Sequence, residues 1–177
     1  MLDTSVIALD NIKINNGQDL LSLTEEGPVL LVFLRRFGCV FCQQALKELN
    51  MLREGIESKG FTLCFVHMAT TQQGDDYFTQ FGYTSVLHIS DPSCKLYAQF
   101  GLIKGKFNQL FGLQVWLKTF ETAMKNKSNM FSTYIGDGFQ MPGVFTLHKG
   151  KVTDKYVHKL ASDRPDYQKL ISDNYST

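Results

Sequence analysis

Residues 28–42 read Pro28-Val-Leu-Leu-Val-Phe-Leu-Arg-Arg-Phe-Gly-Cys-Val-Phe-Cys42, an apolar run followed by a basic pair, a glycine and two thiols. The continuous apolar run Val29–Leu34 is typical of a strand covered on both faces, at the centre of a parallel or mixed sheet. After the cysteines, apolar residues recur at helical spacing: Ala45, Leu46, Leu49, Leu52 and Ile56. The stretch therefore predicts a central strand that delivers two thiols to the first turn of a helix.

A second β-rich run, Phe61–Met68, follows the helix after a plausible stop at Gly60. Residues 28–68 thus predict a strand, helix, strand unit of ordinary crossover length. Further along, the pattern favours a helix from Thr70 to Phe81 and a third strand over Ser85–Ser90. Together these elements predict an α/β fold with a central mixed β-sheet flanked by helices.

The second half of the sequence continues this pattern. Asp91 and Pro92 predict the start of a short helix, with Asp91 as its cap. Segment 143–147, a turn and segment 151–157 predict a hairpin, and residues 164–174 a closing helix. Aromatic residues in segment 104–126 recur at mostly helical intervals, which favours a packing surface.

Composition limits the classes of function that the chain can have. Its 177 residues, 44% of them hydrophobic, suffice for one buried core, and no linker-like stretch divides residues 1–177, so we expect a single domain. Lys and Arg number 18 against 17 for Asp and Glu, a net charge of +1. Nothing in this balance attracts nucleic acid or an anionic membrane surface, and we expect neither as a partner.

The compartment follows from the N-terminus and the cysteine count. The first ten residues lack the basic region of a secretion signal, and no run approaches membrane-spanning length. Four cysteines are too few for a disulfide-stapled secreted domain. We therefore expect a cytoplasmic protein, in which a C-x-x-C pair indicates either catalysis or a metal site.

A zinc site is the weaker interpretation of the pair. Zinc needs about four ligands, and the candidates beyond Cys39 and Cys42 are Cys64, His67, His88, Cys94 and the two C-terminal histidines. Cys64 and His67 lie three apart within an apparent strand, where such residues point to opposite faces. We expect no metal and no other cofactor.

Thiol chemistry assigns the roles by position. Cys39, nearer the helix start and the solvent, should be the attacking thiolate, since free N–H groups and the helix dipole lower a thiol's pKa there. Cys42, one turn deeper, should resolve the mixed disulfide. An ideal helical i, i+3 pair is too far apart for an S–S bond, so Cys39 must lie at an irregular helix start, with Gly38 supplying backbone freedom. Of the two arginines, Arg36 is favoured to face the sulfur.

The other two cysteines and the two histidines nearest to the strand ends are expected to have structural roles. Cys64 is expected to be a small buried hydrophobe. Cys94, near the start of a short helix, is the better candidate for a second reactive thiol, although an inert cysteine is the default. His67 and His88, at or near strand ends, are expected to be hydrogen-bonded structural residues.

These motifs resemble a known family. The C-x-x-C unit at 28–68, together with Met141-Pro-Gly-Val-Phe-Thr-Leu-His-Lys-Gly-Lys151, resembles the thioredoxin-like fold. Segment 31–42, Ser90-Asp-Pro and segment 136–145 narrow this likeness to the peroxiredoxin-like branch of the AhpC/TSA family, over roughly residues 15 to 160. The resemblance implies that Pro142 is a cis-proline facing Cys39 and that Met141 offers its backbone to a peptide substrate. The resemblance also implies that the protein could form a homodimer, as relatives in this family often do.

The chain departs from typical peroxiredoxins at the peroxidatic site. Those proteins carry Pro-x-x-x-Thr-x-x-Cys, in which Pro shields the cysteine and Thr helps to bind peroxide. Here Val32 and Arg36 occupy the two positions, and Cys42 adds a second thiol. The departure favours disulfide exchange over peroxide reduction.

The leading hypothesis is therefore a thiol-disulfide oxidoreductase, an antioxidant protein in which Cys39 attacks and Cys42 resolves. An external thiol reductant of the thioredoxin or glutathione type would regenerate the dithiol, and the substrate would be a protein disulfide or a peroxide. One alternative is a thiol peroxidase that reduces hydrogen peroxide or organic hydroperoxides through Cys39. The other is a non-catalytic binding module that uses the aromatic 104–126 segment.

Overall fold

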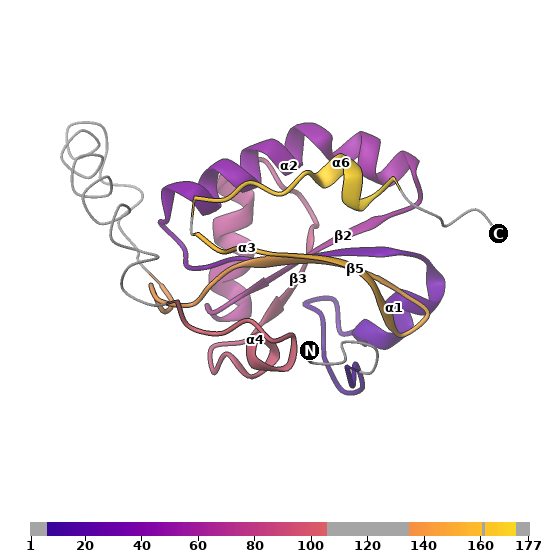
Figure 1. The fold of residues 1–177 in the computed structure, drawn as a ribbon, viewed down its shortest axis with the longest axis horizontal. Coiled ribbons are helices and arrows are strands. Elements are labelled where there is room, and N and C mark those ends of the chain that lie inside the picture. The colour runs from indigo at the N-terminus through magenta and orange to yellow at the C-terminus, as the bar shows by residue number, and fades with distance from the viewer. Residues whose placement is uncertain (1–6, 106–134, 161, 173–177) are drawn as a thin grey trace.

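A five-stranded mixed sheet forms the centre of the protein (Figure 1). The computed structural model describes residues 7–105, 135–160 and 162–172. The sheet has the order β3-β2-β1-β4-β5; β1 to β3 are parallel, whereas β4 and β5 are each antiparallel to the strand before them in that order. The strands are β1 (Val29–Phe33), β2 (Thr62–His67), β3 (Leu87–Ser90), β4 (Gly143–His148) and β5 (Lys151–Val157).

Strand β1 holds the predicted central position, and all of its residues are buried. Alternate residues of this strand enter different cores, because successive side chains in a strand point to opposite faces. Leu30 and Val32 belong to one hydrophobic cluster, and Leu31 and Phe33 to another. Burial on both faces explains why β1 reads as a continuous apolar run.

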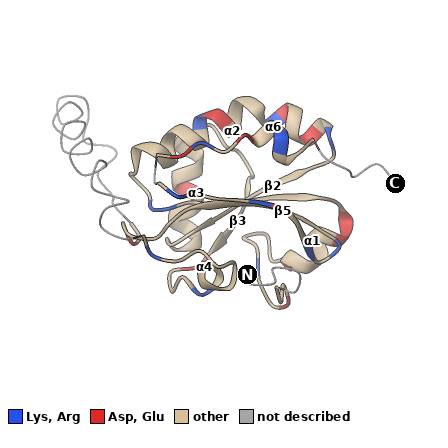
Figure 2. Cartoon of the chain, in the orientation of Figure 1, with Lys and Arg blue, Asp and Glu red and all other residues tan. Residues whose placement is uncertain are grey.

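The helices divide between the two faces of the sheet (Figure 1). Residues of α2, α3 and α6 join the cluster around Leu30, and residues of α1 and α4 join the cluster around Leu31. Positions with Lys or Arg lie among positions with Glu along α2 (Figure 2). The helices are α1 (Leu20–Glu26), α2 (Val40–Ser58), α3 (Thr71–Gln80), α4 (Lys95–Gln99) and α6 (Tyr167–Leu170).

Most predicted elements are confirmed within a residue or two, including the β4–β5 hairpin and α3. Thr70 caps α3 by accepting from the backbone N–H of Gln73, in a complete capping box. Gly60, with φ +81, follows the C-terminal end of α2 as predicted. Most of the aromatic segment 104–126 lies outside the described residues.

Two helices are shorter than the sequence pattern predicts. Helix α4 begins at Lys95, after a turn that contains Pro92, because the Asp91 carboxylate accepts from the backbone N–H groups of Lys95 and Leu96 at 3.1 and 2.8 Å. Helix α6 spans only Tyr167–Leu170. Pro165 disfavours helical geometry at the residue before it, so the helix begins only after Asp166, whose side chain accepts from the Lys169 N–H.

Strand β3 also starts later than predicted, at Leu87 instead of Ser85. Ser85 has a φ of +56, a left-handed conformation that a strand cannot contain.

No helix in the described part of the chain is long and apolar enough to cross a membrane.

Candidate functional site: a buried dithiol

The dithiol lies where β1 ends and α2 begins. Cys39 is the N-cap of α2, with extended φ and ψ of −73° and 125°, and Gly38 before it has a φ of +78. The predicted irregular helix start at Cys39 and the backbone role of Gly38 are both confirmed. A left-handed φ is strained for residues with a Cβ, so glycine is the residue suited to this turn.

Neighbouring elements hold the turn in place. The Gly38 N–H donates to the Tyr77 hydroxyl of α3 at 3.3 Å, and the Phe37 N–H donates to the Ile135 carbonyl at 3.0 Å. The Phe37 ring also stacks on Tyr77, with centroids 3.9 Å apart. The cysteines are therefore presented by a turn that is fixed from two sides.

Both thiols are buried, and no disulfide joins them. Cys39 is 0% exposed and Cys42 is 5% exposed. The prediction that Cys39 lies nearer the solvent is therefore wrong, because the turn through Gly38 directs its side chain into the cluster around Leu30. A substrate must approach through a cavity.

The two thiols have opposite electrostatic environments. The Cys42 thiol donates a hydrogen bond to the Cys39 sulfur, and this contact contributes most to lowering the pKa of Cys39 to about 5. The Arg35 charge and backbone N–H groups at the helix start lower it further, against the opposing effect of burial. The same hydrogen bond and burial raise the pKa of Cys42. At neutral pH Cys39 is a thiolate and Cys42 a thiol.

Arg35, and not Arg36, contacts the reactive sulfur. Arg35 Nη1 lies 3.7 Å from Cys39 Sγ, and Nη2 donates to the Gly138 carbonyl. Arg35 is only 4% exposed, which strengthens its field at the sulfur. The preference for Arg36 failed because β1 ends at Phe33, and beyond that residue strand alternation no longer fixes side-chain direction. Arg36 packs instead near Gly136 and Gly138.

The expected role of Met141 and Pro142 is only partly retained. Pro142 lines the cavity with both cysteines, but no cis peptide bond occurs among the described residues, so the implied cis-proline is wrong. The Met141 N–H donates to the Ile103 carbonyl at 3.3 Å, and its carbonyl accepts from the Gln140 side chain at 3.4 Å. The Met141 backbone is thus already hydrogen-bonded within the chain, which argues against its pairing with a peptide.

A cavity of about 40 Å³ gives access to the dithiol. Its walls come from the end of β1, the first three turns of α2, the start of β4, and the segment from the end of β5 to the start of α6. Most of the lining is apolar, and its ionisable members besides the thiols are Arg35, Glu48, His158, Asp163, Arg164 and Tyr167. The sequence pattern offered His158 only as a candidate zinc ligand, and no pattern placed it or the segment that follows it beside the thiols.

The other cysteines behave as expected of structural residues. Cys64 is 0% exposed, and burial raises its pKa. Cys94 is half-buried with a raised pKa, caused first by desolvation and then by Asp91, which argues against a second reactive thiol. Cys64 and His67 contact different faces of the sheet, as predicted. No three potential metal ligands gather among the residues that the structure describes.

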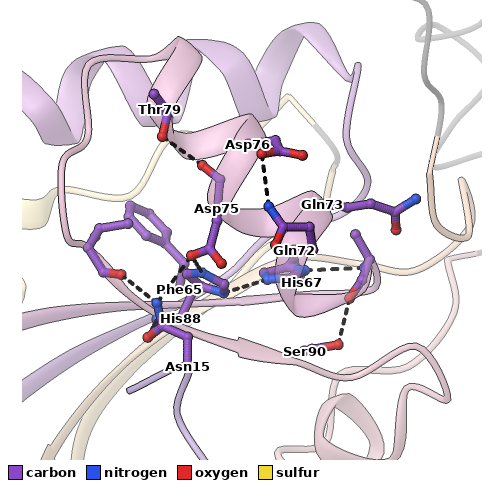
Figure 3. A network of polar contacts seen from close by, with 12 residues as sticks. Asn15, Phe65, His67, Gln72, Gln73, Asp75, Asp76, Thr79, His88 and Ser90 are labelled. Atoms are coloured by element: carbon purple, nitrogen blue, oxygen red, sulfur yellow. Dashed lines mark hydrogen bonds and ion pairs between the residues drawn. The ribbon is translucent and has the colours of Figure 1, made fainter. Parts of the chain in front are cut away.

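A second polar cluster, built on two buried histidines, links β2, β3 and α3 (Figure 3). His67 at the end of β2 bonds His88 of β3 through Nε2 and Nδ1 at 2.9 Å, and His88 Nε2 bonds Asp75 Oδ1 of α3 at 2.8 Å. The Ala69 N–H donates to His67 Nδ1 at 3.2 Å. Each histidine is hydrogen-bonded, as predicted, but their connection into a relay was not predicted.

Hydrogen-bond directions in this relay follow from its ends. Because Ala69 N–H is a donor, His67 Nδ1 must accept, so the His67 proton lies on Nε2. His88 Nδ1 then accepts that proton, and His88 Nε2–H donates to the Asp75 carboxylate. Every ring nitrogen of the relay is satisfied while both rings are neutral. Burial first, and then His88, lower the His67 pKa to about 3, consistent with a neutral ring.

The relay contacts the dithiol turn through aromatic rings. The His67 ring lies 5.1 Å from the Phe37 ring, and Gly74 of α3 packs so closely that an added Cβ would lie 2.5 Å from His67 Nε2. Glycine at position 74 therefore allows α3, which carries Tyr77, to approach the sheet. The only sequence signal for this cluster was a histidine near the end of each of two strands that prove to be neighbours.

A mixed sheet in this strand order, with a thiol pair at the junction of β1 and α2, defines a thioredoxin-like protein of the peroxiredoxin-like branch. The chain belongs to the AhpC/TSA antioxidant enzyme family, whose sequence model matches residues 48–161. The match begins after Cys42, so the dithiol precedes the matched region.

Similar proteins agree with this class. Prostamide/prostaglandin F synthase of Danio rerio is 26% identical over 152 residues, covering 84% of this chain and 75% of that protein. Thioredoxin-like protein AAED1, chloroplastic, of Arabidopsis thaliana is 22% identical over 176 residues, covering 93% and 70%.

Solved structures show the same fold at low sequence identity. Xanthomonas campestris bacterioferritin comigratory protein, described as reducing alkyl peroxides, superposes with a TM-score of 0.58 at 16% identity, over 85% of this chain and 82% of that one. A peroxiredoxin 6 mutant from Arenicola marina gives 0.63 at 11% identity, over 95% and 69%. The thioredoxin-like fold predicted from the sequence is confirmed.

Proposed function

We propose that the protein is a thiol-disulfide oxidoreductase in which Cys39 is the nucleophile and Cys42 the resolving thiol. The observation that carries the proposal is the unequal pair itself. A thiolate with a pKa of about 5 lies beside a thiol of raised pKa that bonds it, with Arg35 against the reactive sulfur. Dithiol exchange requires this division, because one sulfur must attack while the other waits protonated.

The proposed reaction balances as follows. Cys39 thiolate attacks one sulfur of the substrate disulfide, forming a mixed disulfide and releasing the first thiolate, which takes a proton from solvent. Cys42 loses its proton and attacks Cys39 sulfur, which releases the second substrate thiol and forms the Cys39–Cys42 disulfide. Two electrons pass to the substrate, and an external thiol reductant returns them, either one dithiol of the thioredoxin type or two monothiols of the glutathione type.

Reduction of an organic peroxide is the second candidate, favoured by the mainly apolar cavity and by Arg35 beside the sulfur. Cys39 would take one oxygen as sulfenic acid and release an alkoxide, which is protonated to the alcohol. Cys42 would then condense with the sulfenic acid and release water. The Xanthomonas neighbour's described activity supports this candidate, whereas Val32 and Arg36, in place of Pro and Thr, weigh against it.

We place the reaction in a reducing compartment, with the cytosol as first choice and a plastid as the alternative suggested by the Arabidopsis relative's name. The remaining alternative is a non-catalytic binding module, and the pKa of Cys39 distinguishes it from an enzyme. That alternative requires an ordinary thiol pKa of about 8.5 for Cys39, against the lowered pKa at the helix start.

Reduction of an aromatic disulfide and consumption of an alkyl hydroperoxide, each coupled to thioredoxin and its reductase, test the proposal. Cys39→Ser should abolish turnover of both substrates, and Cys42→Ser should accumulate the mixed disulfide, detected by mass spectrometry. Cys94→Ser, a cysteine change outside the cavity, is the matched control and should retain full activity. Turnover by Cys39→Ser, or a Cys39 that titrates as a free thiol, would contradict the proposal.

A further inference from the structure

The resolving step raises a chemical question that the two cysteines do not answer by themselves. Cys42 is 5% exposed, its pKa is raised, and its thiol donates to the Cys39 thiolate. Once Cys39 is in a mixed disulfide, that anionic acceptor is gone. Cys42 must then transfer its proton to another group before it can attack, because the thiolate is the nucleophile.

His158 brings an unused nitrogen to the same cavity. It directly follows β5, and its backbone N–H donates to the Pro142 carbonyl at 3.4 Å. The ring packs edge-on against Tyr156, with centroids 5.2 Å apart at 84°. His158 Nδ1 is buried and has no hydrogen-bond partner, and the residue lines the cavity with both thiols. A buried ring nitrogen without a partner is uncommon in a structural histidine.

The surroundings of His158 keep its ring neutral near pH 7. Desolvation lowers its pKa, which Asp163 and the Leu160 backbone partly counteract. A neutral imidazole can accept a proton, and a cavity of this size has room for a water that could carry it. The other ionisable groups in the cavity besides the thiols are Arg35 after β1, Glu48 on α2, Asp163 and Arg164 in the segment after β5, and Tyr167 on α6.

Other cavity groups are poorer proton acceptors. The Asp163 carboxylate already accepts from the Lys159 and Leu160 N–H groups at 2.7 and 2.8 Å. Tyr167 has a raised pKa and is protonated. Glu48 follows Cys42 by six residues on α2, a rise of about 9 Å along the helix axis.

We propose that His158 is the general base of the resolving step, accepting the Cys42 proton directly or through one water. This inference rests on the proposed function. The proton leaves Cys42 Sγ for His158 Nδ1, Cys42 sulfur bonds to Cys39 sulfur, and the bond between Cys39 and the substrate sulfur breaks. His158 then returns the proton to the departing substrate thiolate, so that protons and electrons balance.

A symmetric aromatic disulfide with a coloured thiolate separates the two steps in a single turnover. The first equivalent of colour reports attack by Cys39, and the second reports attack by Cys42. Because this thiolate leaves without needing a proton, the second phase isolates deprotonation of Cys42. His158→Gln should leave the first phase unchanged and slow the second by about 10²-fold, as expected for loss of a general base.

The pH profile and two other variants complete the experiment. In the wild-type protein the second phase should be nearly flat above neutral pH, whereas in His158→Gln it should rise about tenfold per pH unit, as hydroxide replaces the base. Added imidazole should restore part of the rate in His158→Ala. His148→Gln, at the end of β4 and outside the cavity, is the matched control and should match the wild type in both phases.

The outcomes separate the two proposals. No first phase in the wild-type protein would overturn the proposed function itself. An intact first phase with an unchanged second phase in both His158→Gln and His158→Ala would overturn the assignment of His158 alone. A second phase slowed by Glu48→Gln and not by the His158 variants would transfer the role to Glu48.

Discussion

The dithiol cavity and the histidine relay are two polar clusters on the same side of the sheet. They differ in how completely their buried polar atoms are hydrogen-bonded. In the relay, each ring nitrogen of His67 and His88 has one partner. In the cavity, His158 Nδ1 and Arg35 Nε have none, and Cys39 holds a negative charge at 0% exposure. Buried polar groups usually cost free energy unless satisfied. The matched cluster therefore stabilises the fold, whereas the incomplete cluster retains groups that can react.

The largest effect on this contrast should come from breaking the relay. His88→Leu leaves the buried His67 Nε2–H without a partner, whereas the half-exposed Asp75 carboxylate can be hydrated, so we expect a loss of about 2 kcal/mol in the free energy of unfolding. Chemical denaturation measures it. The double variant His67→Leu/His88→Leu removes both partners of the central bond and should recover part of the loss. If the double variant loses as much stability as the single variants His67→Leu and His88→Leu lose together, the two rings are not coupled.

The cavity should respond in reactivity more than in stability. Cys42→Ala removes the hydrogen bond that lowers the Cys39 pKa most, and Arg35→Met removes the positive charge that lowers it next. Both variants should therefore raise the Cys39 pKa, and Arg35→Met should raise it by about one pH unit. The pH dependence of Cys39 alkylation, in a Cys94→Ser background, measures the shifts. Arg35→Lys keeps the charge and is the control. A larger shift from Arg35→Met than from Cys42→Ala would contradict the assigned order of causes.

The last prediction is a dependence of stability on pH, which is small for each pH unit but accumulates over the range below neutral pH. The His67 pKa is about 3 in the folded protein and near 6.5 when unfolded, so between these values only the unfolded chain takes up the proton. Stability is therefore complete above pH 6.5 and falls toward pH 3, by at most about 1.4 kcal/mol per pH unit for this one group. Denaturation of wild type and His67→Gln over this range should give a shallower slope for the variant. Equal slopes would remove His67 as the source.

The fold and the dithiol could be predicted from the sequence because their signals are local. A strand buried on both faces reads as an unbroken apolar run, and a C-x-x-C at a helix start states its geometry within a few residues. The capping box at Thr70 is equally local. Such patterns need no knowledge of which segments meet in space.

The features that were missed depend on contacts between distant segments. Arg35 faces Cys39 because its guanidinium reaches the Gly138 carbonyl, which no spacing rule reveals. His158 enters the cavity because the segment after β5 turns back over α2, held by Pro142. The relay requires β3 to lie beside β2 and a glycine at position 74. Side-chain direction beyond the end of a strand is set by such tertiary contacts.

The two edges of the sheet have a consequence for self-association. At the β3 edge, the Asn15 N–H donates to the His88 carbonyl at 2.9 Å and the Asn15 side chain accepts from the His88 N–H at 3.1 Å. The β5 edge carries exposed charges at Lys151, Asp154 and Lys155. Covered or charged edges resist the addition of another strand. The native sheet is therefore a poor template for edge-to-edge addition of a second copy of this chain and for fibril growth.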